Sequence, residues 1–112
     1  MKNVVVEIDA RRISDWNSFY DVFAEAFGFP DFFGRNMDAW IDCMTSLDSP
    51  EDGMTRINVE PGQVVVIQLN HVKDFARRCP EQCAAIIEGA AFVNWRRIDI
   101  GEEPVIALSF FN

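Results

Sequence analysis

The stretch from Phe32 to Met44 reads Phe-Phe-Gly-Arg-Asn-Met-Asp-Ala-Trp-Ile-Asp-Cys-Met and joins an aromatic–glycine turn to a short helix. Asn36 can cap this helix, because its side-chain oxygen can accept a hydrogen bond from a backbone N–H of the first turn. Behind it, apolar residues recur at spacings of three and four, the period of one helix face. They are Met37, Trp40, Ile41, Met44 and Leu47. The stretch therefore predicts an amphipathic helix that begins just after Asn36.

The opposite face of this helix is acidic and polar. Asp38, Asp42 and Thr45 fall there, again three and four residues apart. Two carboxylates four residues apart destabilise a helix by roughly 0.2–0.5 kcal/mol, and the positive end of the helix dipole offsets this more for Asp38 than for Asp42. A cost of this kind is typical of a surface that meets a positive partner. The other interpretation is a pair of ordinary solvated acids.

The acidic excess is concentrated around this helix. The chain carries a formal charge of −8, and residues 31–52 hold six acids against one base, Arg35. The acids are Asp31, Asp38, Asp42, Asp48, Glu51 and Asp52. Such a field attracts a cationic protein and repels nucleic acid, and no basic stripe is present for direct RNA or DNA binding. Charge alone fits a role in solubility equally well.

Three short apolar runs predict β-strands, at Val4–Ile8, Gln63–Leu69 and Val105–Phe110. Segments with helical periodicity separate them. Strands that alternate with helices predict an α/β fold, here a small three-stranded parallel sheet with helices covering at least one face. The length of 112 residues suits one domain, 1–112.

Local signals predict the helix boundaries. Ser14 is expected to cap the first helix and Gly28 to end it. Asn70 is expected to cap a short helix, and Pro80 to lie in the first turn of a long one. Residues 48–62, rich in Pro, Gly and acids, predict a loop of about a dozen residues that either widens a binding surface or is mobile.

Several classes of protein are not indicated. No apolar run approaches the roughly 20 residues that span a bilayer, and the acidic N-terminal segment is not a signal peptide. The three cysteines have no disulfide-framework spacing, so we expect a reduced, cytoplasmic protein that is monomeric when free. Cys79, Cys83 and His71 fit no zinc pattern, so we expect neither a metal nor a cofactor.

The segment Phe29–Leu47 resembles the barstar family of intracellular ribonuclease inhibitors. The shared pattern is an apolar residue, Pro, an acid, two aromatics, Gly, any residue, Asn, an apolar residue, Asp and Ala, followed by a helix with a second Asp and a Cys. Outside this segment the likeness lies in the order of strands and helices. The resemblance implies a three-stranded parallel sheet packed with helices, and a second helix that plugs the active site of a ribonuclease together with the loop before it.

By matching position, the resemblance also implies a role for individual residues. Asp42 takes the place of a substrate phosphate among the enzyme's cationic side chains, and Asp38 is the earlier acidic contact. Phe32 matches an aromatic that packs against the enzyme's catalytic histidine. The other residues of the implied partner-binding site are Phe33, Gly34, Arg35, Asn36 and Thr45.

Four features depart from the family pattern. Both aromatics of the turn lack the family's phenolic hydroxyl, and Arg35 puts a positive charge where the best-known member has an acid. Ile41 replaces a tryptophan near the interface. Asn94 lies in the region of the family's late-helix acidic contact but is uncharged. These departures leave open whether the partner is a different ribonuclease or another basic protein.

Two other functions fit the same residues. Asp38 and Asp42 could serve a small hydrolase, but no histidine, lysine or third carboxylate lies nearby in the sequence, so we expect no enzyme. The second alternative is a binding or regulatory module without a nuclease partner. An inhibitor should present a convex acidic surface, whereas an enzyme needs a concave pocket. The arginine pairs 77–78 and 96–97 are expected on solvated faces that balance local acids.

Overall fold

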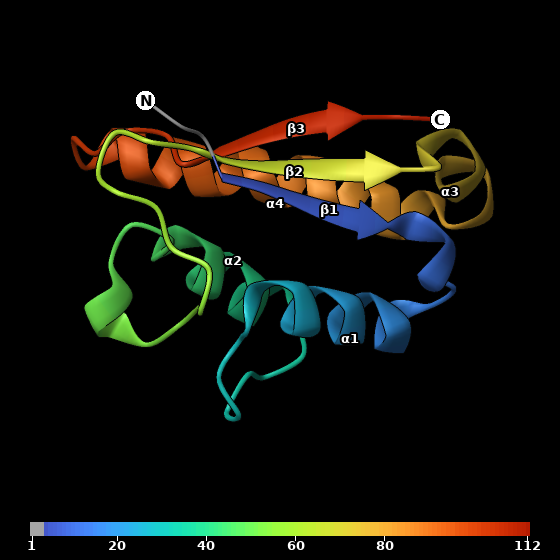
Figure 1. Ribbon diagram of the computed structural model, residues 1–112, viewed down its shortest axis with the longest axis horizontal. Helices are drawn as coiled ribbons and strands as arrows, with labels where there is room; N and C mark the ends of the chain where they lie inside the picture. Colours follow the sequence, from blue (N-terminus) through green and yellow to red (C-terminus); the bar gives the residue numbers. More distant parts are fainter. Residues whose placement is uncertain (1–3) are drawn as a thin grey trace.

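The computed structural model describes residues 4–112 and contains the predicted sheet. Its strands are β1 (Val4–Asp9), β2 (Val65–Asn70) and β3 (Ile106–Phe110). All pairings are parallel, and the order β1-β2-β3 places β2 in the centre (Figure 1). The expectation of a small three-stranded parallel sheet in an α/β fold is confirmed.

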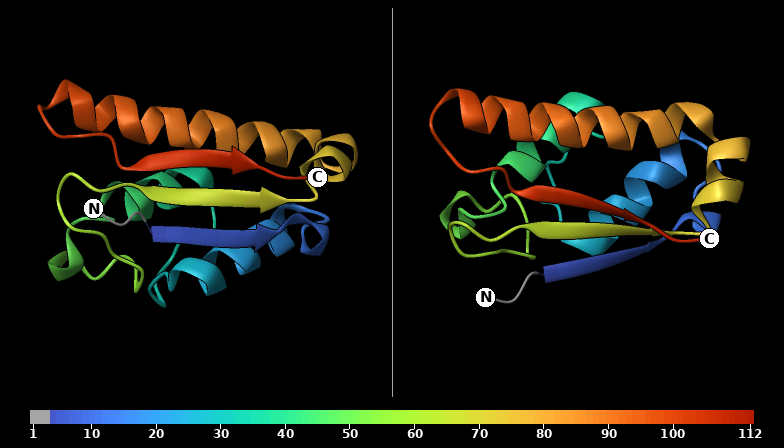
Figure 2. Two further views of the ribbon diagram at one scale, coloured as in Figure 1. Left: turned by 45° about the horizontal axis from the view of Figure 1, so that its top comes forward. Right: turned by 90° about the horizontal axis from the view of Figure 1, so that it is seen from above.

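Four α-helices accompany the sheet: α1 (Trp16–Phe27), α2 (Met37–Thr45), α3 (Val72–Arg78) and α4 (Pro80–Asp99). Two single-turn 3₁₀ helices, η1 (Ala10–Arg12) and η2 (Pro50–Asp52), complete the described elements. The right panel of Figure 2 shows α1, α2 and α4 on one side of the sheet.

Only one face of the sheet is covered, so residues of β1 and β2 alternate between buried and more accessible positions. In β1 the side chains of Val6 and Ile8 are buried, while Val5 and Glu7 are exposed. A continuous valine run is typical of a strand buried on both faces, but here the helices pack on one side alone.

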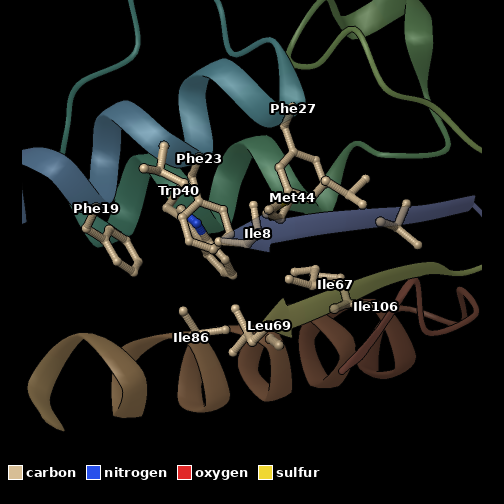
Figure 3. Close-up of a cluster of buried hydrophobic side chains, with 14 of the residues drawn as sticks. Ile8, Phe19, Phe23, Phe27, Trp40, Met44, Ile67, Leu69, Ile86 and Ile106 are labelled. Carbon is tan, nitrogen blue, oxygen red and sulfur yellow. The ribbon is translucent and has the colours of Figure 1, made fainter. Parts of the chain in front are cut away.

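The core lies between the covered face of the sheet and the helices, and it is rich in aromatic rings (Figure 3). Trp40 of α2 is fully buried and meets the ring of Phe23 of α1 edge-on, with centroids 5.6 Å apart. Gly89 lets α4 approach this tryptophan, because a Cβ there would lie 2.9 Å from Trp40 Cζ3. Edge-to-face pairs add about 0.5–1.5 kcal/mol each to the free energy of area burial. The apolar stripe of α2 therefore fixes the helix between α1 and α4.

The boundaries of α1 and α4 follow local chemistry. Asp15, not Ser14, caps α1: its carboxylate accepts from the Ser18 N–H at 2.8 Å, and Ser18 Oγ accepts from the Asp15 N–H, which forms a capping box. Gly28 ends α1 with a φ of +69°, as predicted. Pro80 begins α4, also as predicted.

The prediction that Asn70 caps α3 is wrong. Asn70 is the last residue of β2, paired in register with Asp9 of β1, and its side-chain amide donates to Glu7 on the exposed face of the sheet. The residue that precedes α3 is His71, whose φ is +61° and whose side chain makes no capping bond. Strand β2 therefore extends one residue further than predicted, and Asn70 belongs to the strand and not to the start of α3.

Candidate functional site: the acidic face of α2

The loop between α1 and α2 presents one aromatic ring to solvent and packs its neighbour inward, partly buried. Phe33 packs on Phe29, with ring centroids 4.7 Å apart, and also meets Tyr20 of α1. Phe32 points outward and is 75% exposed. One of the two rings thus packs inward while Phe32 stays accessible. A large apolar ring held in solvent by a packed neighbour is typical of a contact residue.

Asn36 fixes the junction between this loop and α2. Its Oδ1 accepts from the Ala39 N–H at 2.8 Å, which confirms the predicted cap. Its Nδ2 donates to the Gly34 carbonyl at 3.3 Å. The same side chain therefore ties the turn to the first residues of the helix, and the loop and α2 form one unit.

Arg35 is bonded to α1. Its guanidinium pairs with Asp21 at 2.9 Å and donates to Asn17 Oδ1 at 2.6 Å. The group also lies 6.0 Å from the centre of the Tyr20 ring. The positive charge that departs from the family pattern is therefore neutralised within the chain.

The acidic residues of α2 are exposed, as predicted. Asp38 lies in the first turn, and within residues 4–112 no ion pair involves it. The Asp42 side chain is 61% exposed, and its Oδ1 lies 3.1 Å from Arg96 Nη1 of α4. Thr45 is half-buried, and its hydroxyl donates to the Ile41 carbonyl at 2.6 Å. The accessible charge of the face thus belongs to the two aspartates.

Asp42 and Phe32 border the same shallow depression, of about 160 Å³. Its lining comprises Pro30, Phe32, Phe33, Gly34, Ala39, Asp42, Cys43 and Met54. Burial, and then the neighbouring Asp42 charge, raise the pKa of the Cys43 thiol to about 11, so this group stays neutral. Asp42 is the only ionisable residue besides Cys43 in that lining, and the depression lacks the convergent polar groups of an enzyme pocket.

Arg97 corrects the expectation that both arginines of the 96–97 pair are solvated. Its side chain is only 3% exposed and meets both oxygens of Asp48, at 2.9 and 2.7 Å. It also donates to the Thr45 carbonyl at 2.8 Å and to the Glu103 carbonyl at 2.7 Å. The sequence signal was the helical spacing that continues the buried row of α4 through Val93 to Arg97.

The region 48–62 is bonded to the rest of the molecule. The Val59 N–H donates to the Leu47 carbonyl at 2.9 Å, and the Arg56 N–H to the Phe27 carbonyl at 2.8 Å. Together with the Asp48–Arg97 pair, these bonds hold the loop against the C-terminal ends of α1 and α2. They provide a defined support for the candidate site.

The side chain of Asn94 on α4 is bonded to the backbone of β3 and of the residue before it. Its Oδ1 accepts from the backbone N–H groups of Val105 and Ile106, and its Nδ2 donates to the Ile106 carbonyl at 2.9 Å. These bonds occupy the outer edge of β3 where the strand begins. The residue that α4 does bring to Asp42 is Arg96, which the sequence prediction did not associate with the site.

Cys79 and Cys83 are both buried, and the Cys79 thiol points at the Ile13 carbonyl, 3.6 Å away. No group of three or more His, Cys, Asp or Glu in residues 4–112 is arranged to hold a metal ion. None of the helices in that range is long and apolar enough to cross a bilayer.

A model of the family described as Barstar (barnase inhibitor) matches residues 3–100. The chain belongs to the barstar family. This match includes β1, β2, the acidic face of α2 and the whole of α4, so the resemblance noted for Phe29–Leu47 extends over most of the chain. The barstar family is an inhibitor family and not a catalytic one. A search of curated proteins found no match.

Proposed function

We propose that this member of the barstar family inhibits a ribonuclease of the barnase type by inserting the exposed face of α2, with the loop before it, into the enzyme's active site. A ribonuclease must hold cationic groups that stabilise the charge on the phosphate. A carboxylate fixed on a helix can satisfy those groups in place of the phosphate. The observation that carries the proposal is that Asp42 and Phe32 border one depression on a loop–helix unit fixed by Asn36.

Each residue has a distinct task in this proposal. Asp42 pairs with the cations at the centre of the enzyme's site, and Asp38, one helical turn away, pairs with cations at its border. The Phe32 ring covers these ion pairs and excludes water, which strengthens them. Gly34 and Asn36 set the shape of the loop, while Phe33 anchors the loop by packing on Phe29.

The experiment is an inhibition assay in which a barnase-type ribonuclease cleaves RNA in the presence of increasing amounts of the chain. Asp42→Ala removes one partner of a buried charge pair in the complex, which costs about 2–5 kcal/mol. This corresponds to inhibition weakened by about 30-fold or more. Phe32→Ala should weaken inhibition without abolishing it.

Glu25→Ala is the matched control. The Glu25 carboxylate is 67% exposed and pairs with a single exposed arginine, Arg12, at 2.8 Å, much as Asp42 pairs with Arg96. The control changes the net charge equally but leaves the face of α2 intact, so inhibition should stay at the wild-type level. Equal inhibition by wild type and Asp42→Ala would remove Asp42 from the mechanism. Wild type that does not inhibit would count against the proposed target itself.

A further inference from the structure

Two adjacent arginines of α4 make very different ion pairs. Arg97 is buried and meets both oxygens of Asp48. Arg96 makes one contact to Asp42, from Nη1 to Oδ1 at 3.1 Å, and the two side chains are 41% and 61% exposed. The first pair is part of the interior. The second is a surface pair of the kind that contributes little to stability.

The buried Arg97–Asp48 pair determines where the exposed Arg96–Asp42 pair forms. Arg97 binds the carbonyl of Thr45, the last residue of α2, and thereby fixes the end of α4 against the end of α2. Arg96 is the residue just before Arg97 on α4, and its guanidinium is presented at Asp42, three residues before Thr45. The contact between Arg96 and the acidic face is therefore set by the packing of α2 and α4.

We propose that Arg96 is an internal competitor for Asp42, meaning a cation that occupies this carboxylate in the free protein and that a partner must displace. The inference rests on the proposed function and states which cationic partner can bind. One surface cation of a basic protein offers Asp42 no more than Arg96 already gives. Several cations fixed in a water-poor active site offer more, because electrostatic attraction strengthens as the effective dielectric constant falls. Arg96 thereby selects a clustered cationic site over isolated lysines and arginines.

The competitor also opposes binding after it has been displaced. Its guanidinium remains on α4 beside the interface, where it faces the partner's cations, and charges of like sign raise the free energy of the complex. Removal of Arg96 should therefore strengthen binding. If Arg96 instead held Asp42 in its binding orientation, removal of Arg96 would weaken binding.

The test measures the dissociation constants of two probes, a barnase-type ribonuclease and a hexa-arginine peptide, by calorimetry at fixed salt concentration. The variants are Arg96→Ala, Asp42→Ala and the double variant. Arg77→Ala is the control, because Arg77 is an exposed arginine of α3 that pairs with Asp74, so the net charge changes equally at a remote place. Arg96→Ala should tighten binding of both probes by about 1.5- to 5-fold beyond the control, as expected for release of an exposed ion pair.

The double variant separates this inference from a general charge effect. In the Asp42→Ala background no carboxylate remains to compete for and only the repulsion beside the interface is left, so Arg96→Ala should tighten binding clearly less than it does when Asp42 is present; equal tightening in both backgrounds would show a general charge effect. Weaker binding of either probe by Arg96→Ala, or an effect equal to the control, overturns the inference. If wild type binds only the peptide, the ribonuclease target is wrong, while tighter peptide binding that requires Asp42 still supports the competitor. Failure to bind either probe overturns both proposals.

Discussion

The clearest stability prediction concerns the buried guanidinium of Arg97. Arg97→Met keeps the apolar stem but leaves the Asp48 carboxylate and the Thr45 and Glu103 carbonyls without their donor. Breaking a buried pair by removal of one partner costs about 3–5 kcal/mol. Asp48 is 12% exposed and can recruit water, so we expect a loss near the lower figure, about 3 kcal/mol. The whole free energy of unfolding of a domain of this size is about 5–15 kcal/mol.

Urea titrations monitored by tryptophan fluorescence measure this loss in the free energy of unfolding. Thermal unfolding of Arg97→Met should show a Tm lower by about 12 °C or more. Arg96→Met is the matched control, because it removes a neighbouring guanidinium whose ion pair is exposed, and it should cost less than about 1 kcal/mol. A double variant, Arg97→Met with Asp48→Leu, should recover much of the loss, since no uncompensated charge remains. Equal stability of the Arg97→Met and Arg96→Met proteins would refute the reasoning.

Three further predictions concern other contacts. Gly89→Ala should lower the free energy of unfolding by about 1–3 kcal/mol in urea titrations, because the added Cβ meets Trp40 at 2.9 Å; a neutral effect would show that α4 can shift. Asn94→Ala should cost about 1–3 kcal/mol, because backbone groups of the β3 edge lose their partners, and amide hydrogen exchange should rise there first. The Arg11 guanidinium lowers the pKa of Asp9 to about 2, so its contribution to stability is present above pH 3.8 and is lost as the pH falls through about 2. Asp9→Asn should therefore flatten the pH dependence of Tm in that window, and an unchanged profile would contradict the assignment.

The sequence predicted the main elements because their patterns are local or strongly apolar. The strands were found within about two residues, since runs such as Val4–Ile8 have few other stable structures. The α2 helix was predicted from its apolar stripe and from Asn36, whose capping bond depends only on the next turn. Only one of two adjacent rings can pack beneath such a turn, and this leaves Phe32 exposed.

The features that the sequence predicted wrongly or missed depend on contacts between segments far apart in the chain. Asn70 is a good helix cap locally, but pairing with Asp9 draws it into the sheet. Arg97 is charged, and only the arrival of Asp48 and two carbonyls from other segments makes its burial favourable. The contact between Arg96 and Asp42 depends on how two helices pack, which spacing within either helix does not contain.

The position of β2 in the middle of the sheet has a consequence for synthesis on the ribosome. Its two partner strands come from opposite ends of the chain, so both parallel pairings join residues that are far apart in the sequence, such as Val4 with Val65 and Val65 with Ile106. Contacts of such high sequence separation form slowly. The aromatic helices of the N-terminal half can collapse early, whereas the sheet is completed only after β3 has emerged. Until then β2 has an unprotected edge, and the nascent chain is at its most prone to aggregate.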